Sequence, residues 1–235
     1  SSGVSFENIS IVYIDSKMGS QNPQLQIQQL LLRELFHAYS PYHISPELEV
    51  RNIDKNWLSE ALPEYLSWIY LLQNNHLDED AFLAIMEEKM RITEQFNGLS
   101  LDHMSQEIYR NDSYLDAFRS KGCLAVWFLD LKLIEITSGE LTAIDLIKGQ
   151  FSNLDETAQL GIQNIMHVME EDLVFNSSPF MMNKYLIPSG ISYKRKGPLP
   201  NKFERSSADA TEFELIKNEE ASDEQKSLWK RFTSE

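Results

Sequence analysis

Cysteine, glycine and proline are all scarce in this sequence of 235 residues. The one cysteine, Cys123, excludes an internal disulfide framework and a cysteine-rich zinc site, because both need several thiols. No apolar run approaches the roughly 20 residues that cross a bilayer as a helix, so we expect no membrane insertion within this chain. With 9 glycines, 8 prolines and 42% hydrophobic residues, the composition is that of a folded globular protein.

Positive charge is scarce as well. The chain has 21 Lys and Arg against 36 Asp and Glu, which gives a formal net charge of −15 at pH 7. Because proteins gain affinity for nucleic acid by neutralising phosphates with Lys and Arg, this balance argues against a nucleic-acid partner. No basic and apolar leader stands at the start, so the compartment stays open, an extracytoplasmic location after processing included.

Most apolar residues recur with the three-to-four spacing of helices, which predicts a mainly α fold. The exterior of the third helix is expected to carry Glu87, Glu88 and Lys89. Pro63 either kinks the second helix or marks a start near Leu62. Helices are predicted over Leu25 to Tyr39, Trp57 to Leu72, Asp80 to Phe96, Ser113 to Ile136, Thr142 to Ile147, Leu154 to Val174 and Ala221 to Phe232.

The two ends of the chain carry the β signal. Partly alternating β-branched residues from Ser5 to Asp15 predict one strand, with a preceding strand as the alternative, and its sheet partners are expected upstream or later in the chain. A strand or two are expected after Pro188. These patterns divide the chain into a residual strand and turn segment at 1–24, a helical domain at 25–193 and a polar C-terminal extension at 194–235.

A Glu-x-x-His pattern on the first helix carries the strongest chemical signal. Zinc peptidases use H-E-x-x-H on a helix, because residues four apart share a face and the Glu beside the ligands serves as general base. Here Glu34 and His37 fit the second half of that pattern, and Glu60 on the next helix suits a third ligand. Alone, this spacing also describes a solvated Glu and a polar His at a helix end.

Four stretches in the same order resemble the glycyl aminopeptidase family, thermolysin-like metallopeptidases that usually carry an N-terminal β domain and a C-terminal PDZ domain. They are LLRELFHAYSPYHISPEL from Leu31, WLSEALPEYL from Trp57, SKGCLAVWFLDLKLIEITSGELTAIDLI from Ser120 and SPFMMNKYLIPSGISY from Ser178. The resemblance implies a thermolysin-like helical catalytic subdomain with a small N-terminal β element. It also implies that Glu34 is a vestigial general base and that His37 and Glu60 occupy zinc-ligand positions.

The departures from that family concern the residues that do the chemistry. Arg33 replaces the first histidine ligand, and a guanidinium has no lone pair to offer a metal. Arg119 stands where the wider superfamily has the tyrosine that stabilises the tetrahedral intermediate. Losing the metal removes the Lewis acid and the activated water together, and losing an oxyanion donor costs about 10²–10³-fold. We therefore expect Arg33 to reach Glu34, Glu60 or both, as an internal replacement for the ion.

Three interpretations of the function follow. The favoured one is a catalytically degenerate, zinc-free relative of these aminopeptidases, whose old cleft binds a peptide or a partner protein. The opposing one is a working metallo-aminopeptidase with an atypical zinc ligand set, with His43 as the nearest additional ligand. Tyr39 and Trp57 are candidate binding residues, with plain core packing as their alternative, and a purely structural helical domain remains a third reading.

Overall fold

The computed structural model describes residues 2–6, 9–13, 23–39, 56–96, 99–101, 103–104, 112–147, 186–196 and 212–233. Within them the protein is mainly helical, as predicted, with two small two-stranded sheets. The helices are α1 (Pro23–Tyr39), α2 (Asn56–Gln73), α3 (Glu79–Gln95), α5 (Asp112–Ile136), α6 (Ala143–Ile147) and α9 (Asp223–Thr233). The predicted helix over Leu154 to Val174 lies outside these residues.

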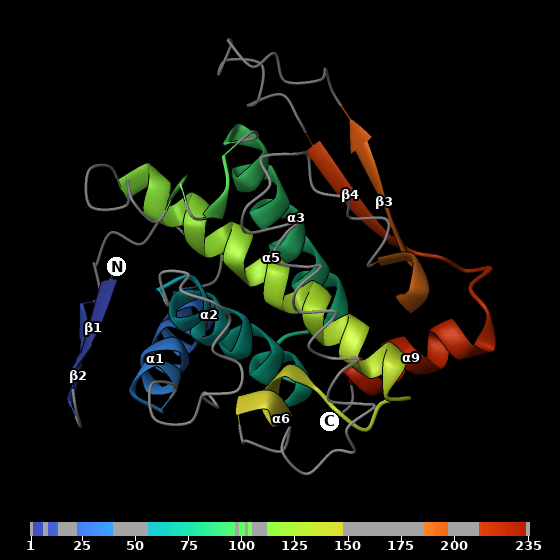
Figure 1. The fold of residues 1–235 in the computed structure, drawn as a ribbon, viewed down its shortest axis with the longest axis horizontal. Coiled ribbons are helices and arrows are strands. Elements are labelled where there is room, and N and C mark those ends of the chain that lie inside the picture. The colour runs from blue at the N-terminus through green and yellow to red at the C-terminus, as the bar shows by residue number, and fades with distance from the viewer. Residues whose placement is uncertain are drawn as a thin grey trace.

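Helix α5 forms the centre of the molecule, with α1 and α2 on one side and α3 on the other (Figure 1). Its sequence is apolar on nearly all sides, and side chains such as Trp127 and Phe128 are fully buried. The prediction of a buried central helix is confirmed. Helix α2 runs through Pro63 without a break, so of the two alternatives for this proline a start near Leu62 is wrong.

The N-terminal strand pairs within a hairpin. Strand β1 (Ser2–Phe6) lies antiparallel to β2 (Ile9–Tyr13), and both contact α1. The expectation of a distant partner is therefore wrong, because the stretch from Ser5 combines the end of one strand with the whole of the next. The pattern of β-branched residues is similar in the two strands, so it does not indicate where the chain reverses direction.

The C-terminal elements pack onto the helical core. Strand β3 (Ile191–Lys196) pairs antiparallel with β4 (Glu212–Lys217), and β4 contacts α3. Helix α9 inserts Trp229 and Phe232 into the core cluster that α2, α3 and α5 share. The short helix η5 (Ile187–Ser189) lies between α9 and β3.

No helix in the described part of the chain combines the length and apolar character that a bilayer crossing requires. The predicted division into segments at 1–24, 25–193 and 194–235 remains a prediction.

Candidate functional site

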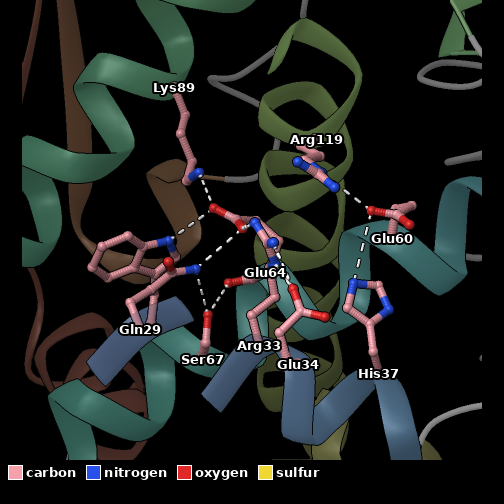
Figure 2. Close-up of polar contacts among 10 residues, drawn as sticks. Gln29, Arg33, Glu34, His37, Glu60, Glu64, Ser67, Lys89 and Arg119 are labelled. Carbon is pink, nitrogen blue, oxygen red and sulfur yellow. Dashed lines mark hydrogen bonds and ion pairs between the residues drawn. The ribbon is translucent and has the colours of Figure 1, made fainter. Parts of the chain in front are cut away.

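Four helices bring a cluster of polar side chains together (Figure 2). Residues four apart share a helix face, so α1 presents Gln29, Arg33 and His37 to the same side, with Glu34 beside them. The facing side of α2 presents Glu60 and Glu64 by the same rule. Lys89 reaches the cluster from α3 and Arg119 from α5.

The inner half of the cluster surrounds the carboxylate of Glu64, whose side chain is 9% exposed. Its Oε1 accepts hydrogen bonds from Lys89 Nζ at 2.6 Å and Trp68 Nε1 at 3.1 Å, and its Oε2 accepts one from Gln29 Nε2 at 3.1 Å. Burial alone would raise the pKa of Glu64, but the charge and hydrogen bond of Lys89 and the charge of Arg33 outweigh it. They hold the pKa at about 2, so Glu64 stays ionised.

Arg33 is buried and directs its guanidinium to two carboxylates. Its Nε and Nη2 donate to Glu34 Oε1 at 3.2 and 2.6 Å, and its Nη1 lies 3.8 Å from Glu64 Oε2. Arg33 was expected to reach Glu34, Glu60 or both; it contacts Glu34, and its second carboxylate is Glu64. Glu60 receives a different cation.

The outer half of the cluster is more open. Arg119 Nε donates to Glu60 Oε2 at 3.1 Å, and His37 Nε2 lies 3.7 Å from the same oxygen, beyond hydrogen-bond length. The side chains of His37, Arg119 and Glu60 are 17%, 23% and 30% exposed. Burial lowers the pKa of His37 from its ordinary value, against the opposing charges of Glu60 and Glu34.

The two expected ligand positions that hold suitable side chains, His37 and Glu60, therefore lie side by side. The position four residues before His37 holds Arg33, which has no lone pair for a metal. In the described part of the chain, no three His, Cys, Asp or Glu side chains are grouped so that they could hold a metal ion. These residues do not fit a three-ligand zinc site. His43, the extra ligand of the opposing reading, lies outside the described residues.

Several residues of this cluster were not among the sequence candidates, and Glu64 and Lys89 are the charged ones. Lys89 was expected on the exterior of its helix; this is wrong, because the side chain is buried and pairs with Glu64. Glu64 follows Glu60 by four residues, and this spacing is the signal that places it on the same face of α2. Tyr39 and Trp57 belong to α1 and α2, but their side chains lie outside the described part.

The described part of the chain has a mainly helical fold with two small two-stranded sheets. A crystal structure of an aminopeptidase N family protein from Idiomarina loihiensis matches 80% of this chain with a TM-score of 0.60 and 17% sequence identity. This chain spans 38% of the length of that protein. No protein-family model and no curated protein matches the sequence. At this identity the likeness concerns the fold.

Proposed function

We propose that this chain is a peptidase-like protein that is derived from zinc aminopeptidases, has lost zinc chemistry and binds a peptide or protein segment beside Glu60. The likeness of its fold to part of an aminopeptidase N family protein supports the ancestry. The observation that carries the loss of zinc is the position of Arg33. It stands one helical turn before His37, on the same face of α1, and turns a buried guanidinium toward Glu34 and Glu64.

The charges of the cluster support the same proposal. The carboxylates of Glu34, Glu60 and Glu64 are each paired with a cation from the chain itself, and Lys89, Arg33 and Arg119 supply that charge. A buried ionised group is tolerated when it is paired and hydrogen-bonded, so the cluster is balanced without a divalent ion. A zinc ion at His37 and Glu60 would compete with Arg119 for the carboxylate of Glu60. It would also lie near the positive charge of Arg33.

One observation favours the second candidate, a metallo-aminopeptidase with an atypical ligand set. His37 and Glu60 converge to 3.7 Å although they belong to different helices. A catalytic zinc generally takes three protein ligands, so this candidate needs a third from outside the described residues, with His43 the nearest in sequence.

Zinc titration by calorimetry distinguishes the two candidates. We expect the wild-type protein to show no tight zinc site, and Arg33→His to gain one per chain because it restores the missing ligand. The double variant Arg33→His/His37→Ala is the control and should lose the gained site. A tight wild-type site that His37→Ala removes would contradict the proposal. Failure of Arg33→His to gain zinc, in a variant shown to be folded, would count against an ancestral metal site here.

A further inference from the structure

The two arginines of the cluster use their nitrogens differently. Arg33 engages Nε, Nη1 and Nη2 with carboxylates and is 9% exposed. Arg119 engages only Nε, in its bond to Glu60, and its side chain is 23% exposed. Within the described part of the chain, no hydrogen bond or ion pair occupies the two terminal nitrogens of Arg119. The guanidinium therefore keeps one edge of N–H donors for a group from outside.

The hydrogen bond from Arg119 to Glu60 holds the guanidinium in place. Glu60 comes from α2 and Arg119 from α5, so the contact joins two helices that pack against each other in the core. A donor held in place before a ligand arrives loses less conformational freedom on binding than a free surface side chain.

We infer that Arg119 binds a carboxylate of the peptide ligand through its two terminal nitrogens, an inference that rests on the proposed peptide binding. The flat guanidinium fork matches a carboxylate with two parallel N–H···O bonds, which a lysine or a neutral amide does not offer. A singly charged carboxylate suits the site better than a phosphate, since Glu60 and the net charge of −15 oppose a dianion. The carboxylate comes from a peptide C-terminus or from an Asp or Glu side chain.

Three short peptides test the inference in the intact protein. The first is N-acetylated pentaalanine with a free C-terminus, the second is its C-terminal amide, and the third is that amide with aspartate as its central residue. Calorimetry should show at least about tenfold tighter binding of a carboxylate-bearing peptide than of the plain amide. Preference for the first peptide alone assigns a C-terminus, and comparable binding of the third assigns a side chain.

Variants on α5 connect the effect to one residue. Arg119→Gln should abolish the preference for a carboxylate. Lys132→Gln is the matched control, because Lys132 forms a similar half-exposed pair with Glu135 on the same helix, roughly 20 Å along its axis. Equal binding of acid and amide by the wild type, or a preference that survives in Arg119→Gln, would overturn the inference and leave peptide binding intact.

A chemical probe separates this inference from the proposed function. Phenylglyoxal labels accessible guanidinium groups, so mass spectrometry should find Arg119 labelled and Arg33 spared. Excess N-acetylalaninate should slow labelling of Arg119, while N-acetylalanine amide should not. If no peptide binds but N-acetylalaninate protects Arg119, the carboxylate site stands and the peptide-binding function fails. If peptides bind and no carboxylate protects Arg119, the inference fails alone.

Discussion

At the scale of single residues, the buried carboxylate of Glu64 makes the stability of the fold depend on pH. Its pKa is lowered from 4.5 to about 2, so the folded state binds fewer protons than the unfolded state between those pH values. Its contribution is therefore present above pH 4.5 and is lost as the pH falls to 2. It amounts to about 3 kcal/mol, at 1.36 kcal/mol for each pKa unit.

Glu64→Gln should lower the free energy of unfolding at pH 7 by about 3–5 kcal/mol, because Lys89 and Arg33 lose the charge that compensates them in the interior. Urea unfolding measures this loss, and repeating it from pH 2 to 6 should show that the difference from wild type shrinks toward acid. Glu135→Gln, in a half-exposed pair, should change stability by less than about 1 kcal/mol. A loss at position 64 that does not vary with pH would contradict the assignment.

Asp130 should show the opposite dependence on pH. Tyr65 donates a hydrogen bond to its Oδ2, and the backbone N–H of Ala143 at the start of α6 donates to its Oδ1 at 2.6 Å. Burial nevertheless dominates and raises the pKa of Asp130 from 3.8 to about 6. For a raised carboxyl pKa, the stabilising contribution is complete below pH 3.8 and disappears as the pH rises to 6.

We therefore expect the stability of the wild type relative to Asp130→Asn to fall by about 3 kcal/mol between pH 3.8 and 6. The asparagine is uncharged at both ends of this range and can still accept from Ala143. Denaturant unfolding of both proteins across that range provides the measurement. A relative stability that stays constant or rises would show that the pKa of Asp130 is not raised in the folded state.

The sequence predicts only some residues of the site. Glu34, His37 and Glu60 follow from the zinc-peptidase pattern on the first two helices, and Arg119 follows from the family resemblance. The pair of Glu64 and Lys89 cannot be predicted in this way, because it joins two helices whose relative position is not encoded in the periodicity of either. Lysine in a run of charged residues is typical of a helix exterior, and only its carboxylate partner makes burial tolerable here.

At the scale of elements, the helices of the described residues were predicted to within two residues at each end, because the apolar periodicity of each continues to its end. The predicted ranges from Asp80 and from Ser113 correspond to α3 (Glu79–Gln95) and α5 (Asp112–Ile136). Strand pairing was harder, because two adjacent strands gave one continuous pattern. The contacts of the C-terminal elements depend on long-range packing that local patterns do not report.

Helix α9 provides a prediction at this scale. Phe232 is buried against Phe82 of α3 and Trp229 of its own helix, with ring centroids 5.7 and 4.9 Å away. Phe232→Ala should therefore lower the free energy of unfolding by about 3–5 kcal/mol in a single cooperative transition. Lys230→Ala on the exposed side of α9 is the control and should change it by less than about 0.5 kcal/mol. A negligible effect at position 232 would mean that α9 is dispensable to the core.

At the scale of the whole molecule, the fold has a known likeness, whereas the loss of zinc at the site is our proposal. The arrangement of helices is similar to part of an aminopeptidase N family protein at 17% identity. The side chains between the helices form a charged cluster in which Arg33, Lys89 and Arg119 pair with carboxylates. Many sequences satisfy the same packing of apolar faces, whereas one substitution at a ligand position changes the chemistry of a metal site.

The central claim is that this chain holds its site together without zinc. The most direct test is the metal content of protein purified without chelator and offered excess zinc, measured by plasma mass spectrometry after removal of free metal. The account predicts zinc well below one equivalent per chain, with no difference between the wild type and His37→Ala. One tightly held zinc per chain that is lost in His37→Ala would contradict it.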